Sequence, residues 1–251
     1  MKVIIGIVPA CKRNDENPYE YRYSFINNYS KKILKNNALP IGILLNDCKM
    51  DEDILNICDG FLFPGGNRFE KFHLEILIHA IKYNKPVLGI CLGMQVMVYY
   101  DILKKYIDEF NLSLNIDNLW NAYLKIKDDK IFKLADIKKP NIHGYQIMEE
   151  LVECNIDNIN KSKHNISINE NSILYKIYKE TKKDVYSLHL KKVVNLGNNF
   201  TVCAKANDGV IEAVEYKDKN YFILGVQYHA ELDDNQLFKY FIKEVKNRKN
   251  V

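Results

Sequence analysis

The first half of the chain alternates short apolar runs with longer segments whose apolar residues recur every three or four positions. Short apolar, β-branched runs predict buried parallel strands, and the periodic segments predict helices. The predicted strands are Val3–Val8, Ile41–Leu45, Phe61–Phe63 and the run that begins at Pro86. The predicted helices are Tyr23–Lys35, Asp51–Cys58, Phe72–Tyr83 and the segment after Cys91. This alternation predicts a parallel sheet with helices on both faces.

The second half has a different pattern, in which short apolar runs follow one another with turn residues between them. The predicted strands are Tyr145–Val152, Val185–Leu188, Phe200–Ala206, Val210–Tyr216 and Tyr221–Gln227, and a final helix is predicted over Asp233–Lys246. Asn207-Asp208-Gly209 is typical of a hairpin turn, which predicts an antiparallel pair. We therefore expect an α/β fold, a three-layer sandwich around a mostly parallel sheet with antiparallel strands in the C-terminal half.

Length and composition agree with one enzyme domain. The 251 residues are enough to bury a sizeable core, and the apolar share of 47% and charged share of 27% are ordinary for a globular protein. We expect a single domain over residues 1–251, with an insertion at about 102–140 that carries helical patches. The net charge of +4 is too small to indicate a nucleic-acid partner.

The chain shows no pattern of a membrane or secreted protein. No apolar run is long enough to span a bilayer, and Met1 leads straight into a predicted strand, so neither a membrane span nor a signal peptide is expected. The six cysteines form no C-x-x-C pair, so neither a zinc site nor a disulfide framework is indicated. We expect a cytoplasmic, reduced and metal-free protein.

The run Pro86–Met97, PVLGICLGMQVM, carries the clearest chemical signal. A short apolar strand stops on Cys91 and turns directly into a helix, with Gly89 and Gly93 on either side. This G-x-nucleophile-x-G spacing is that of a nucleophile elbow, because glycines allow a sharp turn and close backbone packing. The sulfur would project at the carboxyl end of the sheet and at a helix N-terminus, which favours the thiolate. A cysteine that only packs in the core is the alternative, and the glycine pair disfavours it.

A cysteine nucleophile needs a base, and the base needs a group that orients it. His229 ends the predicted strand FILGVQY, and Glu231 follows two residues later. The carboxylate can accept a hydrogen bond from one imidazole nitrogen and leave the other facing the sulfur. His-x-Glu alone is a weak signal, since an isolated histidine is more often a surface or core residue. Beside the elbow, it predicts a triad of Cys91, His229 and Glu231.

The segment GFLFPGGN places Pro64, Gly65 and Gly66 directly after a predicted strand. A glycine pair lets backbone N–H groups point into open space, and with the N–H of Leu92 they would form an oxyanion hole. We expect the N–H groups of Gly66 and Leu92 to be the donors and Gly65 to set the loop. An ordinary tight turn is the alternative. The segment contains neither of the glycine patterns that bind phosphate.

These three elements, in this order, resemble the class I glutamine amidotransferase-like superfamily: PGG, then GICLGMQ, then a terminal strand with H-x-E. Two further segments resemble its gamma-glutamyl-gamma-aminobutyrate hydrolase branch. Asp184–Val193, DVYSLHLKKV, is similar to the Asn-Ser-x-His segment of that branch, and Asn207–Tyr216, NDGVIEAVEY, is similar to its hairpin. The resemblance runs from Lys2 to about Lys246 and implies a flavodoxin-like, class I glutamine amidotransferase-like fold.

The resemblance also implies where a substrate would bind. In this superfamily the α-amino and α-carboxylate groups of the glutamyl substrate are held by residues that match Gln95 and the segment of Ser187, Leu188 and His189. The chain departs from the branch after His189, because Leu190 and Lys191 stand where many members have a second histidine and a glutamine. Because of this departure, the sequence does not establish that the substrate is the usual one of the branch.

The activity that the resemblance implies is hydrolysis of the γ-glutamyl amide bond of a small γ-glutamyl amine, through a glutamyl thioester on the cysteine. The partner would be a small-molecule substrate, with no nucleic acid, membrane or cofactor, and a homodimer is left open. Two alternatives remain. The first is a glutaminase subunit that delivers ammonia to a partner synthetase, and the second is a binding module without catalysis, which the intact triad disfavours.

Overall fold

The structure is a computed structural model. It describes residues 1–13, 21–45, 50–127, 135–136, 162–189 and 191–249.

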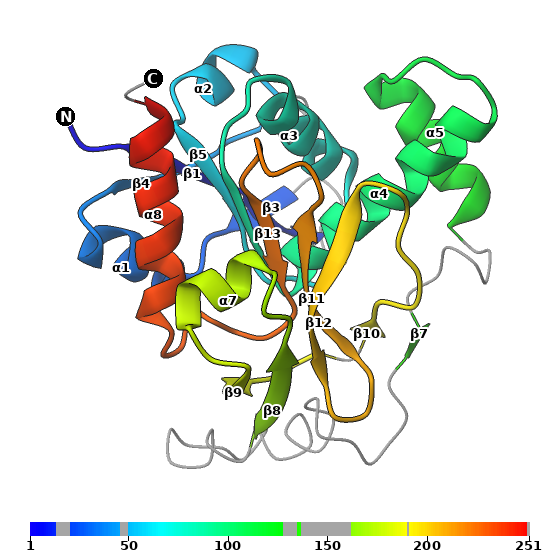
Figure 1. Cartoon of the computed structure of the whole chain (residues 1–251). Helices are drawn as coiled ribbons and strands as arrows, with labels where there is room; N and C mark the ends of the chain where they lie inside the picture. Colours follow the sequence, from blue (N-terminus) through cyan, green and yellow to red (C-terminus); the bar gives the residue numbers. More distant parts are fainter. Residues whose placement is uncertain (14–20, 46–49, 128–134, 137–161, 190, 250–251) are drawn as a thin grey trace.

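A nine-stranded sheet forms the centre of the fold (Figure 1), with the strand order β4-β1-β5-β6-β13-β12-β11-β8-β9. The strands are β4 (Leu39–Gly42), β1 (Ile4–Ile7), β5 (Gly60–Phe63), β6 (Val87–Ile90), β13 (Ile223–Val226), β12 (Ile211–Tyr216), β11 (Phe200–Ala206), β8 (Lys163–Ile168) and β9 (Lys182–Tyr186). The pairs from β4 to β13 are parallel, and the pairs from β13 to β9 are antiparallel. The expected α/β architecture, with antiparallel strands in the C-terminal half, is confirmed.

Helices cover both faces of the sheet and make the fold a three-layer sandwich (Figure 1). One face carries α1 (Asn27–Lys35), α7 (Ile173–Tyr178) and α8 (Asn235–Lys249). The other carries α2 (Glu52–Asn56), α3 (Lys71–Lys82), α4 (Leu92–Glu109) and α5 (Ile116–Ile126). Two small antiparallel pairs lie outside the sheet, β2 (Ala10–Arg13) with β3 (Tyr21–Ser24) and β7 (Ala135–Asp136) with β10 (Lys191–Lys192).

The central strands explain why the sheet forms where it does. All four residues of β5, β6 and β13 are buried, as continuous apolar runs between two helical layers must be. The two apolar cores lie on opposite faces of these strands. Parallel strands β6 and β13 are neighbours, so their carboxyl ends, which precede Cys91 and His229, lie side by side.

Several predicted elements differ from the observed ones. The predicted helix Tyr23–Lys35 begins only at Asn27, because Tyr21–Ser24 pairs with β2 as a strand. The predicted strand Ile41–Leu45 is wrong in position, since β4 begins at Leu39 and contains Pro40. Proline is tolerated there because β4 is an edge strand of the sheet. The sequence analysis assigned no element to β8 or α7.

The predicted insertion at 102–140 is described only in part. Residues 102–109 continue α4, and α5 follows and packs against α4 and α3. The predicted strand Tyr145–Val152 lies outside the described residues, and the single-domain division stays a prediction. Within the part of the chain that the structure describes, no helix is both long and apolar enough to cross a membrane.

Candidate active site

The turn at Cys91 has the strained geometry of a nucleophile elbow. Cys91 is the residue before α4, and its backbone has φ of 53° and ψ of −105°, a conformation that L-residues rarely adopt. A Cβ atom at Gly93 would lie 2.2 Å from the carbonyl oxygen of Phe63, and one at Gly89 would lie 2.6 Å from the carbonyl carbon of Gly93. Both positions therefore require glycine, and the tight packing holds Cys91 in its turn.

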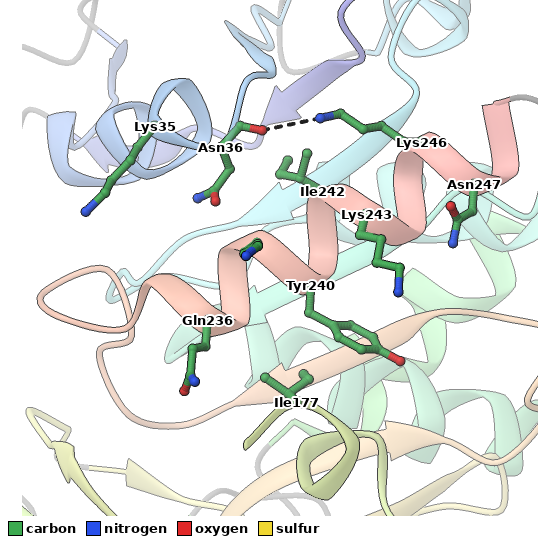
Figure 2. Close-up of a pocket in the computed structure, with 10 residues that line it drawn as sticks. Lys35, Asn36, Ile177, Gln236, Tyr240, Ile242, Lys243, Lys246 and Asn247 are labelled. Atoms are coloured by element: carbon green, nitrogen blue, oxygen red, sulfur yellow. Dashed lines mark hydrogen bonds between the residues drawn. The ribbon is translucent and has the colours of Figure 1, made fainter. Parts of the chain in front are cut away.

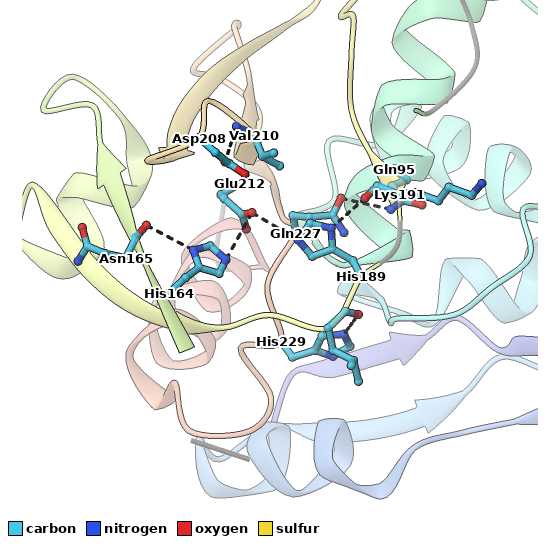
Figure 3. A network of polar contacts seen from close by, with 11 residues as sticks. Gln95, His164, Asn165, His189, Lys191, Asp208, Val210, Glu212, Gln227 and His229 are labelled. Carbon is cyan, nitrogen blue, oxygen red and sulfur yellow. Dashed lines mark hydrogen bonds and ion pairs between the residues drawn. The ribbon is translucent and has the colours of Figure 1, made fainter. Parts of the chain in front are cut away.

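His229 is oriented by three contacts. Its backbone N–H donates to the carbonyl oxygen of Tyr186 at 2.8 Å. Its Nδ1 lies 2.6 Å from Oε1 of Glu231, and its Nε2 lies 3.3 Å from the carbonyl oxygen of Leu188, the contact drawn at His229 in Figure 3. Carboxylate and carbonyl oxygens accept hydrogen bonds, so both ring nitrogens are placed to donate, which favours the imidazolium form.

The imidazole and the cysteine flank the same glycine. A Cβ atom at Gly65 would lie 3.2 Å from Cε1 of His229 and 3.5 Å from Cβ of Cys91. Burial disfavours the charged imidazole, but the hydrogen bonds and charges of Cys91 and Glu231 outweigh it and hold the pKa of His229 well above its usual value. The structure thus brings together the three side chains that the sequence analysis selected as a triad.

The glycine loop lies against the start of α4. A Cβ atom at Gly66 would lie 3.0 Å from Cδ2 of Leu92, so the two residues with the predicted oxyanion donors are neighbours. The N–H of Gly65 donates instead to the hydroxyl oxygen of Tyr29 at 3.0 Å. This bond anchors the loop, in agreement with the expectation that Gly65 sets it. The oxyanion role of Gly66 and Leu92 stays a prediction.

Tyr29 is a site residue that the sequence analysis missed. It lies in the first turn of α1 and is fully buried, and its hydroxyl accepts from Gly65. Burial first, and then the charge of Glu231, raise the pKa of Tyr29, so the hydroxyl stays protonated and able to donate to Glu231. From the sequence, its spacing to Ile33 indicates only the apolar face of a helix, and nothing local marks the hydroxyl.

The residues predicted to hold the glutamyl group lie around the triad, and most of their side chains are buried. Nε2 of Gln95 donates to Oε1 of Gln227 at 3.2 Å. Ser187 is fully buried, and Leu188 presents its carbonyl oxygen to His229. Nε2 of His189 lies 3.4 Å from Oε1 of Glu212, and these two side chains form, with His164, a cluster that could hold a metal ion. The substrate-binding role of these residues stays a prediction.

A separate depression of about 660 Å³ lies between α1, α7 and α8 (Figure 2). Four lysines line it, from α1 and α8: Lys35, Lys239, Lys243 and Lys246. Its lining does not include Cys91 or His229, so it is not part of the site around the elbow.

Comparisons with known proteins identify relatives of this chain. Residues 135–231 match the family model described as Peptidase C26, a range that includes His229 and Glu231 and lies after Cys91. A glutamine amidotransferase-like protein of Rickettsia prowazekii is 29% identical over 289 aligned positions, which cover 98% of this chain and 98% of that protein.

Two further similarities are to CTP synthases. The CTP synthase of Methanosphaera stadtmanae is 30% identical over 212 aligned positions, which cover 78% of this chain and 36% of that protein, so this chain spans about a third of its length. The solved glutaminase domain of Trypanosoma brucei CTPS with bound acivicin has a TM-score of 0.64 and 18% identity, and the match covers 98% of this chain and 94% of that one. The structural likeness supports the fold.

Proposed function

The chain belongs to the class I glutamine amidotransferase-like superfamily and is a hydrolase of that type, and on this premise we propose that it hydrolyses small γ-glutamyl amides with a triad of Cys91, His229 and Glu231. One observation carries the proposal. The strained elbow places Cys91 beside the glycine that His229 also contacts, and Glu231 lies 2.6 Å from the outer nitrogen of that imidazole.

In the first half of the proposed reaction, the Cys91 thiolate attacks the γ-carbonyl carbon. The carbonyl oxygen becomes an oxyanion and accepts hydrogen bonds from the N–H groups of Gly66 and Leu92. The His229 imidazolium then gives its proton to the departing nitrogen, the C–N bond breaks, and the amine leaves. A γ-glutamyl thioester remains on Cys91.

In the second half, neutral His229 takes a proton from a water molecule, and the resulting hydroxide attacks the thioester carbon. The C–S bond breaks, the glutamate product leaves, and the Cys91 thiolate and His229 imidazolium are restored. Glu231 stabilises the imidazolium and fixes its orientation throughout, because its carboxylate lies against Nδ1.

A glutaminase subunit is the second candidate, and the similarity to CTP synthase favours it. A glutaminase releases ammonia for a partner synthetase, whereas an amide hydrolase releases a larger amine to solvent. The Peptidase C26 match favours hydrolysis of a peptide-like amide bond.

Kinetics over a panel of substituted γ-glutamyl amides, with glutamine included, separates the two candidates. We expect the purified protein to hydrolyse at least one substituted amide with kcat/KM at least about tenfold above that for glutamine, a difference of ~1.4 kcal/mol. A best rate with glutamine, reached only after a synthetase is added, would establish the glutaminase candidate instead.

Substituting Glu231 by glutamine should move the alkaline limb of activity to lower pH. Acylation needs protonated His229, so kcat/KM falls as pH rises through its pKa. The Glu231 charge is one cause of the raised pKa of His229, and an amide removes that charge, so the pKa of His229 falls. The measurement is kcat/KM against pH for both proteins. If kcat/KM of Glu231→Gln fell at the same pH as in the unsubstituted protein, or at a higher pH, this role of Glu231 would be contradicted.

Tyr29 is proposed as a positioning residue that ties the oxyanion loop to the triad. Tyr29→Phe removes the acceptor of the buried Gly65 N–H, a loss of about 1–3 kcal/mol, and lets the loop shift. We expect kcat to fall about tenfold or more while KM changes little, because the loop acts on the transition state.

Tyr178→Phe is the matched control for Tyr29→Phe. Tyr178 is also buried, and its hydroxyl bonds to Asp234 and Tyr228, away from the glycine loop. This variant should lose a comparable amount of stability and keep its kcat. If both variants lowered kcat equally, Tyr29 would have only a structural role.

A further inference from the structure

We propose that His164, His189 and Glu212 form a binding site for a divalent metal ion of the zinc type, separate from the triad. His164 lies on β8, Glu212 lies on β12, and His189 follows β9, so three distant segments supply the cluster (Figure 3). The sequence analysis expected no metal, because the cysteines form no C-x-x-C pair. The proposal does not depend on the proposed function, since its test measures metal binding.

The spacing of the three side chains fits ligands around a cation. Nε2 of His164 lies 3.6 Å from Oε1 of Glu212, and Nε2 of His189 lies 3.4 Å from the same oxygen. Hydrogen bonds of this kind are about 2.7–3.2 Å long. Zinc ligands lie about 2.0–2.2 Å from the ion, so two ligands of a tetrahedral site are roughly 3.3–3.6 Å apart. The ligand atoms of all three residues lie within 4.8 Å of one another.

Hydrogen bonds at Nδ1 of both imidazoles orient the rings so that each Nε2 faces Glu212. Nδ1 of His189 lies 2.8 Å from the carbonyl oxygen of Lys191, and Nδ1 of His164 lies 3.3 Å from that of Asn165. A carbonyl oxygen only accepts, so each Nδ1 carries the proton, and in a neutral ring Nε2 presents its lone pair. Histidines that bind metals are oriented in the same way, by donating the other N–H to a carbonyl or carboxylate.

The three side chains of the cluster are buried together. Glu212 is fully buried, and the His164 and His189 side chains are 3% and 1% exposed. An opposite charge stabilises a buried carboxylate, and a bound cation would supply one. A proton on one imidazole is the competing source of that charge, and it is an outcome of the test. Two imidazole nitrogens and a carboxylate oxygen form a ligand set that zinc accepts, with a fourth position open.

A metal ion bound to His189 would also stabilise the segment that contacts the proposed base, His229. His189 follows Leu188, whose carbonyl oxygen lies 3.3 Å from Nε2 of His229. The ion would tie this segment to β8 and β12 and so hold the carbonyl in place.

The test is zinc binding by the full chain carrying Cys91→Ala, which removes the thiolate of the elbow as a competing ligand. The protein is dialysed against a chelator and titrated with zinc alone, and bound metal and thermal unfolding are measured. We expect one zinc per chain, and a Tm higher by about 5 °C or more when free zinc reaches about a hundred times its Kd. X-ray absorption of the bound zinc should show imidazole ligands and no sulfur.

Glu212→Gln and His164→Asn should lose this binding. His79→Asn is the matched control and should keep it, because His79 is a buried imidazole near another carboxylate, 3.9 Å from Glu52. The absence of stoichiometric zinc in the Cys91→Ala protein, a sulfur ligand in the absorption spectrum, or undiminished binding in Glu212→Gln would overturn the proposal. The first of these outcomes would show that the cluster is held together without a metal ion. The titration and the spectrum decide the question even if the Glu212 variant fails to fold.

Discussion

Substitution of Cys91 by alanine is expected to lower kcat/KM by about 10³-fold or more, which is ~4 kcal/mol of lost transition-state stabilisation. The reason is that the substitution removes the sulfur atom that is proposed to form the thioester. The fold should survive, because Gly89 and Gly93 set the turn through backbone packing, and alanine keeps the Cβ atom of Cys91. Kinetics with a γ-glutamyl amide, together with a thermal unfolding curve, checks both statements. Substantial hydrolysis by folded Cys91→Ala protein would refute the mechanism.

Cys58→Ala is the matched control for this variant. Cys58 is buried in the apolar core on the other face of the sheet from Cys91. Burial raises the pKa of Cys58 to about 11, so it stays a thiol at neutral pH. Burial also raises the pKa of Cys203 well above its usual value. A glutamine-like electrophile should therefore label Cys91 before either of them, and mass spectrometry of the labelled protein checks this. First labelling at Cys58 or Cys203 would count against Cys91 as nucleophile.

Substitution of His229 by alanine should cost nearly as much as loss of the nucleophile, again about 10³-fold in kcat/KM. Cys91 and His229 are proposed to act as a unit, since one supplies the electron pair and the other moves the proton at each step. Effects within such a unit are not additive, so the Cys91→Ala/His229→Ala double variant should be no slower than either single variant. Side-by-side kinetics of the three proteins measures this.

His79→Asn serves as the control for a buried imidazole outside the site and should keep its activity.

If His229→Ala retained most of its kcat, another group would have to act as the base. His189 would be one such candidate, and its Nε2 lies 3.4 Å from Oε1 of Glu212.

The features that depend on local chemistry could be predicted from the amino-acid sequence. The elbow was predictable because a strand, a nucleophile and two flanking glycines form one short segment. The contact that makes glycine necessary at position 93, with the carbonyl oxygen of Phe63, comes from another strand. The apolar runs of β5 and β6 predicted buried parallel strands because each run is local. Because parallel strands end at one edge of a sheet, the neighbouring ends of β6 and β13 bring Cys91 and His229 together.

Tertiary structure decided which polar groups are buried against which partners. Tyr29 has the pattern of an ordinary helix core position, and only folding places its hydroxyl on Gly65. His164 lies in β8, which the sequence analysis did not predict, and Glu212 lies in a predicted strand, but only the sheet brings them to His189. The strand at Tyr21–Ser24 likewise depends on pairing with β2. For Tyr29, His164 and Glu212 the stabilising partner lies far along the chain, so short-range patterns of hydrophobic and polar residues do not reveal it.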